Sequence, residues 1–281
     1  MTQEPRTTIV TVTFNSASVI ENMLDSLPKD SAIILVDNNS QDQTLEIAKN
    51  YTCTTVTLDE NVGFGRACNI GAAKAKTDYL FFLNPDAQLE AETLSKLEQT
   101  LDENSQIGAA NPTLKNKSGF AKLKTRSMFS PKNWPQVDIS KNCKMPILSG
   151  AALFVRRKAF EDVGGFDPNI FLYHEDHELT YRLRQAGWDL YHVANAQARH
   201  IAGTGSARTN DTAWWKGYHM SRAGIYAFRK TFHRSRLLQT LAFSIMGVIM
   251  PHNLFSGRHR AKYLGQIVGA WSARKDGGVF K

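Results

Sequence analysis

The sequence predicts an α/β fold in which helices flank a mostly parallel β-sheet, followed by a helical C-terminal extension that is both basic and apolar. Strand-like and helix-like segments alternate from the N-terminus to Leu83. The strand-like segments are almost continuously apolar, which is typical of parallel sheets covered on both faces. Residues 222–281 hold eleven basic residues and one acid, a net +10 against +8 for the whole chain, so the basic charge belongs to the extension.

The predicted elements of the first half alternate between strand and helix. The β-branched run TIVTVTF over 8–14 predicts the first strand, and a stripe of apolar residues over 16–27 predicts the first helix. The alternation continues with a strand over 32–36, a helix over 44–50, a strand over 54–58 and a helix over 65–76. The apolar run YLFFL over 79–83 predicts a buried strand that ends at Asn84 and Pro85.

The second half is predicted to hold shorter elements around a long loop. A short strand is expected over 108–112, whereas residues 115–146 are polar and Lys-rich and predict a long loop over the site. The remaining elements are a strand over 149–157, a short helix over 158–163, a helix over 175–186 that Gly187 caps, and an extended segment over 190–201. We expect one domain over 1–205 and a helical region over 206–281.

Composition limits the class of protein. The three cysteines, Cys53, Cys68 and Cys143, are widely spaced and form no metal-ligand pattern, so reduced thiols in a cytoplasmic protein are the simplest interpretation. The first residues, MTQEPRTT, contain no charged-then-apolar signal segment, and nothing in them indicates export. The basic extension has no recognisable nucleic-acid-binding module, so we expect no nucleic-acid partner.

Polar side chains follow three of the predicted strands. Ligands of parallel α/β sheets bind at the carboxyl ends of the strands, so these residues are candidates for a binding site. They are Thr13 and Asn15 after the first strand, Asp37, Asn38 and Asn39 after the second, and Asn84 and Asp86 after YLFFL. The alternative is that the Asn and Asp residues only form turns.

Two further segments have the residue types of a functional site. The run YHEDHE over 173–178 places three carboxylates and two imidazoles at the start of a predicted helix, where complementarity to the helix dipole is one explanation. Glu175 and Asp176 are adjacent and cannot share a helix face, so one of them can face a cleft. The run GFGRACNIG over 63–71 predicts a glycine-rich turn around Arg66, although tight turning and close helix packing explain its glycines equally well.

Asp86 is the candidate ligand of a divalent metal ion. A rigid proline places this single acid at the end of a buried strand. A metal ion bound to a diphosphate needs only one or two protein carboxylates, because phosphate oxygens and waters complete its coordination. His200, at the end of the last extended segment, is the candidate second ligand, and a partly buried structural histidine is the alternative.

Seven blocks occur in order along the chain. They are VTFNS at 12–16, VDNNS at 36–40, NVGFG at 61–65 with Asn69 and Gly71, LNPDA at 83–87, SGA at 149–151, VGGFD at 163–167 and HED at 174–176. Each is weak alone, but their order and spacing are specific. Over residues 8–203 the chain resembles the inverting glycosyltransferases of family 2, in particular the bacterial rhamnosyltransferase-like branch. The resemblance implies the Rossmann-like GT-A fold for a catalytic domain over 1–205.

For the donor, the resemblance implies contacts at the ends of the first strands and in the glycine-rich turn. Asp37 and Arg66 would contact the base of the nucleotide. Thr13 would lie beside the nucleotide, and we count Asn15 with it as a donor-binding residue.

For the chemistry, the resemblance implies a base, an acceptor contact and a metal site. Asp176 would be the catalytic base and Glu175 an acceptor contact. Asp86 would be the metal-side acid of the family's Asp-any-Asp motif, with His200 near the diphosphate or the metal. Asn84 replaces the first acid of that motif, which leaves a ribose hydrogen bond but removes one negative charge and weakens the expected metal affinity.

The implied function is transfer of a sugar, with inversion, from a nucleotide sugar to a hydroxyl of a saccharide. Asp176 would take the proton of the attacking hydroxyl, and Mg²⁺ or Mn²⁺ would stabilise the leaving nucleoside diphosphate. We expect dTDP-β-L-rhamnose as the donor, with UDP-hexoses second. The expected acceptor is a polyprenyl-diphosphate-linked saccharide in the synthesis of bacterial cell-surface polysaccharide such as O-antigen.

Two other classes of protein stay open. One is a catalytically inactive nucleotide-sugar-binding protein, against which the presence of Asp176 argues. The other is a nucleotidyltransferase, which would ordinarily have a glycine-rich loop with a basic residue directly after the first strand. Here that strand is followed by Asn15, Ser16, Ala17 and Ser18.

The C-terminal region contains an apolar run, LLQTLAFSIMGVIMP over 237–251, between basic clusters. The clusters are Arg234 and Arg236 on one side and Arg258, Arg260 and Lys262 on the other. Fewer residues are present than the roughly 20 that span a bilayer. We therefore predict an interfacial helix on an anionic membrane, with the protein peripheral at the inner face of the plasma membrane. A helix packed on the catalytic domain or in a dimer interface is the alternative.

Overall fold

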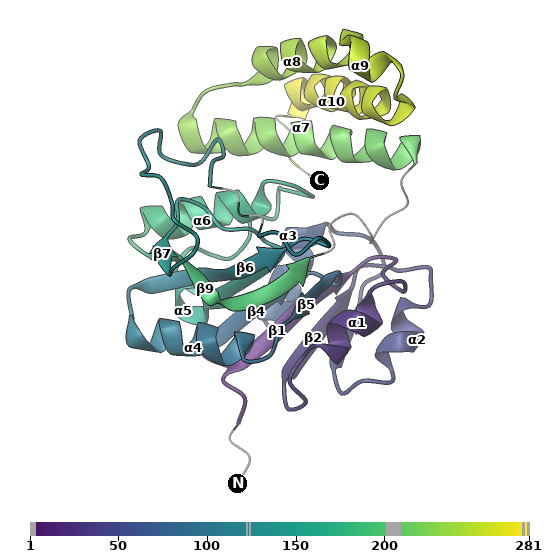
Figure 1. Cartoon of the computed structure of the whole chain (residues 1–281). Coiled ribbons are helices and arrows are strands. Elements are labelled where there is room, and N and C mark those ends of the chain that lie inside the picture. Colours follow the sequence, from purple (N-terminus) through teal and green to yellow (C-terminus); the bar gives the residue numbers. More distant parts are fainter. Residues whose placement is uncertain (1–3, 122, 124, 201–208, 277–278, 280–281) are drawn as a thin grey trace. The chain divides into compact units, whose positions relative to one another are not determined.

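A mixed sheet of nine strands lies within the described part of the chain, which in the computed structural model is residues 4–121, 123, 125–200, 209–276 and 279 (Figure 1). The strands are β1 (Thr7–Thr13), β2 (Ala32–Asp37), β3 (Thr54–Thr57), β4 (Tyr79–Leu83), β5 (Ala87–Leu89), β6 (Ile107–Lys115), β7 (Cys143–Lys144), β8 (Ala152–Arg156) and β9 (Asp189–His200). Their order is β3-β2-β1-β4-β8-β6-β9-β5, with β7 paired to β9.

Strand direction divides this sheet. The strands β3, β2, β1 and β4 are mutually parallel. The next strand, β8, is antiparallel to both β4 and β6, and β9 is parallel to β6 but antiparallel to β5. The predicted α/β fold with helices around the sheet and helices at the C-terminus is confirmed, with antiparallel pairing in the second half of the sheet.

The sheet core explains why the apolar runs form strands. Every residue of β1 and of β4 is buried, as expected for strands covered on both faces. The ring of Phe82 meets that of Phe166 edge to face at 5.1 Å, and Phe81 packs in the same way on Phe154 at 5.7 Å. Burial of each such side chain stabilises the fold by about 1.5–3 kcal/mol relative to exposure.

The helices surround the sheet in the first part of the chain and follow one another directly at its end. They are α1 (Ile20–Asp25), α2 (Thr44–Ala48), α3 (Phe64–Ala72), α4 (Thr93–Glu103), α5 (Arg157–Asp162), α6 (Glu175–Gln185), α7 (Asn210–Phe232), α8 (Leu237–Ile249), α9 (Pro251–Leu254) and α10 (Gly257–Asp276). None of the described helices combines the length and hydropathy needed to cross a membrane.

Several elements differ from the sequence-based expectation. Neither β5 nor α4 was predicted. The three residues of β5 are too few to form a pattern, whereas the stripe of Leu94, Leu97 and Leu101 in α4 is a readable helical signal that was missed. The strand expected over 108–112 extends to Lys115 because β6 is paired along its length with β9. The described residues between 116 and 146 are largely irregular as predicted, apart from the two residues of β7.

The chain divides into two compact units. The first comprises residues 1–62, 66–166 and 176–205 and contains the sheet, and the second comprises residues 63–65, 167–175 and 206–281 and contains the C-terminal helices. The domain boundary expected between residues 205 and 206 lies outside the described residues and stays a prediction.

Glycines allow the helices of the second unit to pack backbone against backbone, with α10 between α7 and α8 (Figure 1). A Cβ at Gly217 would lie 2.1 Å from the carbonyl oxygen of Lys262, and one at Gly265 would lie 2.1 Å from that of Trp214. Such distances exclude any side chain at these positions unless the helices move apart. Close approach of α7 and α10 therefore depends on residues without a Cβ.

Candidate active site

The ends of β1 and β2 hold a buried hydroxyl and a buried carboxylate next to each other. Thr13 and Asp37 are register partners, and the Thr13 hydroxyl donates to Asp37 Oδ1 at 2.8 Å. The backbone N–H of Ser40 donates to Asp37 Oδ2 at 2.9 Å. Both oxygens of the Asp37 carboxylate are thus oriented at the carboxyl edge of the parallel strands, where α/β sheets bind ligands.

The neighbouring polar residues connect loops. Asn15, in the left-handed region with φ +52°, accepts through Oδ1 from the N–H of Gln41 at 2.7 Å. The Asn38 side chain donates to Asn61 Oδ1 at 2.8 Å and accepts from the N–H of Val62 at 2.9 Å. These contacts are those of turn-forming residues, so the role of Asn15 in donor binding stays a prediction.

Arg66 and Asn84, the other two predicted donor contacts, lie at the start of α3 and directly after β4. Arg66 is half-buried in the first turn of α3. Asn84 directly follows β4, and its N–H donates to the carbonyl oxygen of Ala151 at 3.0 Å, which connects the end of β4 to the turn before β8. Their predicted contacts with the donor stay predictions.

The structure brings the two predicted metal ligands together. His200 Nε2 lies 3.1 Å from Asp86 Oδ1, because the β5–β9 ladder pairs Ala87 with His200. Both side chains are mostly buried. Across the described ranges, no group of three or more His, Cys, Asp and Glu side chains is placed to hold a metal ion. A pair of protein ligands fits an ion that takes its other ligands from a diphosphate and from water.

The carboxylate of Asp176, in the first turn of α6, is held by backbone donors. The N–H of Gly150 donates to Asp176 Oδ2 at 2.9 Å, and the N–H of His177 donates to Oδ1 at 2.7 Å. A Cβ at position 150 would lie 3.1 Å from the Cβ of Asp176, so glycine permits this close approach. The side chain of Asp176 is 21% exposed, which leaves the carboxylate accessible.

Asn111 supports the turn that carries Gly150, and the sequence analysis missed it. Its amide nitrogen donates to the carbonyl oxygens of Ser149 (2.9 Å) and Ala152 (2.6 Å), and its Oδ1 accepts from the N–H of Ser149 at 2.7 Å. These bonds also explain why the strand predicted from residue 149 begins only at Ala152. The available signal was one amide within the otherwise apolar start of β6, IGAAN.

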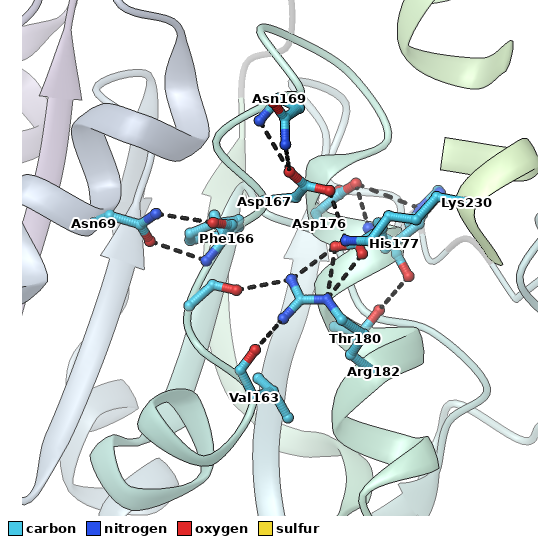
Figure 2. A network of polar contacts seen from close by, with 12 residues as sticks. Asn69, Val163, Phe166, Asp167, Asn169, Asp176, His177, Thr180, Arg182 and Lys230 are labelled. Atoms are coloured by element: carbon cyan, nitrogen blue, oxygen red, sulfur yellow. Dashed lines mark hydrogen bonds and ion pairs between the residues drawn. The ribbon is translucent and has the colours of Figure 1, made fainter. Parts of the chain in front are cut away.

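A second network, also missed, anchors α6 within the first unit (Figure 2). The buried Glu178 carboxylate accepts from Arg182 Nε at 2.8 Å and Nη2 at 2.7 Å. The same guanidinium donates to the carbonyl oxygens of Val163 at 2.5 Å and Gly165 at 2.7 Å. Charge-assisted bonds of this kind are stronger than neutral ones, so they fix the helix that begins at the candidate base.

The residues before α6 have an unusual backbone. Tyr173 and His174 both lie in the left-handed region, with φ +72° and +69°. Such conformations cost of the order of 1–3 kcal/mol each for residues other than glycine and are concentrated at functional sites. Burial, together with the charge of Glu175, raises the pKa of Tyr173 to about 12, so its hydroxyl keeps its proton at neutral pH. Glu175 itself is buried.

Within the second unit, the segment 167–175 is attached to α7 (Figure 2). Lys230 Nζ donates to Asp167 Oδ2 at 2.6 Å, and the Tyr226 hydroxyl donates to the same oxygen at 2.9 Å. Burial alone would raise the pKa of Asp167, but the hydrogen bonds from Lys230 and from the N–H of Asn169 hold it below its ordinary value. A charged carboxylate thus holds the start of the segment that leads to Glu175.

Residues 8–164 match the family model described as glycosyl transferase family 2. The chain belongs to this family. The matched range contains Thr13, Asp37, Arg66 and Asp86, and the candidate base Asp176 follows it.

Curated relatives of this family 2 glycosyltransferase transfer or polymerise sugars according to their names. It is 28% identical to an N-acetylglucosaminyl-diphospho-decaprenol L-rhamnosyltransferase of Mycobacterium tuberculosis, over 68% of this chain and 75% of the relative. It is 26% identical to the O-antigen chain rhamnosyltransferase WbaN of Salmonella anatum, over 70% and 66%. It is 25% identical to a poly-beta-1,6-N-acetyl-D-glucosamine synthase of Staphylococcus epidermidis, over 63% of this chain and 48% of that one.

Solved structures share the fold of this glycosyltransferase. The mannosyltransferase PcManGT of Pyrobaculum calidifontis, solved with GDP-Man and Mn²⁺, superimposes with a TM-score of 0.62 at 16% identity, over 98% of this chain and 88% of that one. TarS 1-349 of S. aureus superimposes with a TM-score of 0.57 at 16% identity, over 97% and 92%. At these identities the likeness shows the GT-A fold alone.

Proposed function

We propose that this glycosyltransferase moves L-rhamnose from dTDP-β-L-rhamnose, with inversion at the anomeric carbon, to a hydroxyl of a lipid-linked saccharide. The observation that carries the proposal is the Asp176 carboxylate, which is oriented by the N–H groups of Gly150 and His177 and is still accessible. The choice of rhamnose is supported by two relatives that are named as rhamnosyltransferases.

Asp176 acts as the general base in this proposal. As the acceptor hydroxyl attacks the anomeric carbon, its proton passes to the Asp176 carboxylate and the bond from that carbon to the nucleoside diphosphate breaks. The electron pair of the broken bond stays on the diphosphate. Because attack and departure occur on opposite faces, the configuration inverts and no enzyme nucleophile is needed. Glu175 is proposed as an acceptor contact.

The donor is held by the strand ends of the parallel part of the sheet. Asp37, fixed by Thr13 and Ser40, accepts from the N–H of the base, and Arg66 contacts the base as well. Asn84 binds the ribose, and Asn15 contributes to the same donor site. The position of Asp37 at the carboxyl end of β2 supports this role, because parallel α/β sheets bind ligands at that edge.

Asp86 and His200 would hold the divalent ion. Their separation of 3.1 Å supports binding of both side chains to the same ion. Solved structures with the same fold contain Mn²⁺. Mg²⁺ or Mn²⁺ bound there supplies positive charge for the leaving diphosphate. The absence of a second carboxylate at Asn84 predicts weak affinity for the ion without the nucleotide.

The proposed acceptor is a saccharide on a polyprenyl diphosphate, in the synthesis of a bacterial cell-surface polysaccharide. Support comes from the relative whose name specifies a decaprenol-diphosphate-linked N-acetylglucosamine and from the relative named for O-antigen. Such an acceptor is embedded in a bilayer and nucleotide sugars are cytoplasmic, so we place the enzyme peripherally at the cytoplasmic face of the membrane.

Transfer from a UDP-hexose is the second candidate. It is supported by the similarity to poly-beta-1,6-N-acetyl-D-glucosamine synthases. The residues at the nucleotide side do not separate the two, because Asp37 can accept from the N–H of either uracil or thymine.

A donor screen tests the proposal. The full-length protein is incubated with Mn²⁺ and either dTDP-rhamnose, UDP-glucose, UDP-N-acetylglucosamine or GDP-mannose, and release of nucleoside diphosphate is measured. We expect slow release of dTDP from dTDP-rhamnose without an acceptor and faster release with a lipid-linked N-acetylglucosamine acceptor. The NMR spectrum of the product should show inverted configuration at the anomeric carbon. Preference for a UDP-sugar would select the second candidate, and binding of a nucleotide sugar without release under any condition would indicate an inactive binding protein.

A further inference from the structure

The helix α8 presents a stripe of large apolar side chains outward. Leu238 is 80% exposed, Ile245 51% and Ile249 64%. These three positions are spaced seven and four residues apart, so they form one stripe along the helix. Met246, one residue after Ile245, is 50% exposed and widens the stripe. We call these four side chains the α8 face.

The inward side of α8 combines two leucines with small and polar residues. Leu237 and Leu241 pack on the cluster of Ile225, Ala270 and Ala273. The hydroxyl of the fully buried Ser244 donates to the carbonyl oxygen of Thr240 at 2.7 Å and lies 3.2 Å from Gln266 Oε1 on α10. A helix on the surface of a water-soluble protein ordinarily has polar residues on its outward side, so the exposed apolar stripe is the unusual feature of α8.

The surroundings of the α8 face are basic. Arg234 is exposed before α8, and Arg258 and Arg260 are exposed after it. Between Arg222 and the C-terminus the sequence contains a single acid, Asp276, against eleven basic residues. An apolar helix face between clusters of cationic side chains is typical of a helix that lies at the surface of an anionic bilayer.

We propose that the α8 face is inserted into the boundary between headgroups and acyl chains of an anionic membrane, with the flanking arginines on the lipid phosphates. The 13 residues of α8 extend about 20 Å, less than the roughly 30 Å of a hydrocarbon core, so the helix lies along the membrane surface. Phe255, 94% exposed in the turn between α9 and α10, provides a further apolar contact.

Charge favours a membrane over a second copy of the chain as the occupant. A two-fold interface through the α8 face would place the same basic clusters of both copies near each other. An anionic bilayer offers the opposite charge. The two occupants also respond differently to salt, because screening weakens attraction to anionic lipid but weakens repulsion between two basic copies.

This surface would hold the enzyme where a lipid-linked acceptor is embedded, a consequence that rests on the proposed function. The attachment itself does not. It is therefore measured without donor or acceptor, and donor hydrolysis is measured on the same preparations without vesicles.

The test uses the full-length protein and sedimentation with vesicles of phosphatidylcholine, either alone or with about one-third phosphatidylglycerol. We expect binding to the anionic vesicles in 0.1 M salt and its loss in 1 M salt, where the Debye length falls from about 10 to about 3 Å. The triple variant Leu238→Gln, Ile245→Gln, Ile249→Gln should bind at least about tenfold more weakly, since three buried apolar side chains are lost. The double variant Arg258→Gln, Arg260→Gln should bind more weakly only at low salt.

Phe120→Gln is the matched control, because it also replaces a largely exposed apolar residue, 73% exposed, but lies in the first unit. It should bind vesicles as the unchanged protein does. All variants should keep the same far-UV circular dichroism and the same donor hydrolysis. Equal vesicle binding by the triple variant, or no binding by the unchanged protein, would overturn the proposal. A dimer in sedimentation velocity that the triple variant abolishes would assign the α8 face to self-association instead.

An Ile245→Trp variant measures depth. Lipids brominated along the acyl chain should quench its added fluorescence if the α8 face is inserted. The same variant is also measured with lipids brominated only in the headgroup region. If these lipids quench the fluorescence as strongly as the acyl-chain-brominated lipids do, the helix lies outside the acyl chains, which would contradict insertion.

Discussion

In the first unit most large apolar side chains are buried between the sheet and its helices, whereas in the second unit many of them are exposed. Phe81 and Phe154 are fully buried between sheet and helices. In contrast, Leu238 and Phe255 are almost fully exposed, and the contact between α7 and α10 is made at glycines. The sheet unit thus has the packing of a water-soluble core, while the helical unit resembles helices that associate in lipid through small residues. The two units thus differ in where they place large apolar side chains, and the proposed membrane contact of the α8 face would account for the difference.

The candidate catalytic, metal-binding and donor-binding residues are also divided unequally between the two units. Thr13, Asp37, Asp86, Asp176 and His200 all belong to the first unit. Within the second unit, the segment that leads to Glu175 is attached to α7 through Asp167 and Lys230. We therefore expect substitutions of these five first-unit residues to change catalysis more than stability, and substitutions in the second unit to change stability or attachment.

The largest expected effect is that of Asp176→Asn. The change keeps the shape and the bond from Gly150 but removes the base, so transfer should fall by about 10²- to 10⁴-fold while donor affinity stays nearly the same. Single-turnover transfer and calorimetry with the nucleoside diphosphate measure the two quantities. Asp162→Asn is the control, an identical change at an exposed carboxylate that pairs with Lys158. Near-normal turnover of Asp176→Asn would show that Asp176 is not the general base, and the chemistry could then no longer be assigned to the first unit.

Sequence reasoning succeeded where a signal is local. The runs of β1 and β4 are apolar on both faces, so consecutive residues alone predict that these strands are buried. The rule that ligands bind at the carboxyl ends of parallel strands then predicts that Thr13 and Asp37 lie at the same edge. It failed where a contact joins distant residues. Nothing near Gly150 or Asn111 indicates that these residues would together orient Asp176, because that contact depends on the tertiary fold.

The orientation of α8 is another feature that depends on tertiary contacts and could not be predicted from the sequence. Its apolar run predicted a helix, and the helix is present. Which side faces outward depends on contacts with α7 and α10: Ser244 and Gly247 meet α10, while Leu237 and Leu241 pack on the cluster around Ile225. Similarly, the pair of Asp86 and His200 was proposed from the residue types and from the resemblance, but the short strand β5 that brings them together had too few residues to be predicted.

The next effect separates the two halves of the donor site. Asp86→Ala should weaken nucleoside-diphosphate binding about 10- to 100-fold in the presence of Mn²⁺ and hardly at all in its absence, since it would remove a proposed metal ligand. Asp37→Ala should weaken binding with or without Mn²⁺, because it would remove the proposed contact with the base. Calorimetry with and without a chelator distinguishes them, with Asp162→Ala as the control. Equal binding by both variants would show that the donor site is elsewhere.

A smaller effect compares glycine packing in the two units. In Gly265→Ala the new methyl group would meet the backbone carbonyl of Trp214 at 2.1 Å, so α7 and α10 must separate. In Gly71→Ala it would meet the side chain of Val10 at 2.5 Å, which can adjust. We expect a loss of about 2–3 kcal/mol in the free energy of unfolding for Gly265→Ala and about 1 kcal/mol for Gly71→Ala. Urea unfolding measures both, and the reverse order would contradict the idea that backbone contact defines the second unit.

At neutral pH the smallest effect is expected from His219, which lies on α7 with its ring 4.4 Å from that of Phe171 and 4.5 Å from that of Trp215. Burial, and then the nearby charge of Arg222, lowers the pKa of His219 to about 4.

Because the folded-state pKa lies below the unfolded value of about 6.5, the contribution of neutral His219 to stability is complete above pH 6.5. It is lost as the pH falls from about 6.5 through about 4. His219→Phe keeps the ring and should change the free energy of unfolding by less than about 1.5 kcal/mol at pH 7.5. At pH 5 it should be more stable than the unchanged protein. Urea midpoints from Trp fluorescence measure this, since three of the five tryptophans, Trp214, Trp215 and Trp271, belong to the second unit. Burial also lowers the pKa of His192 in the first unit, so an equal loss of stability in acid for both proteins would assign the titration to His192 and the sheet.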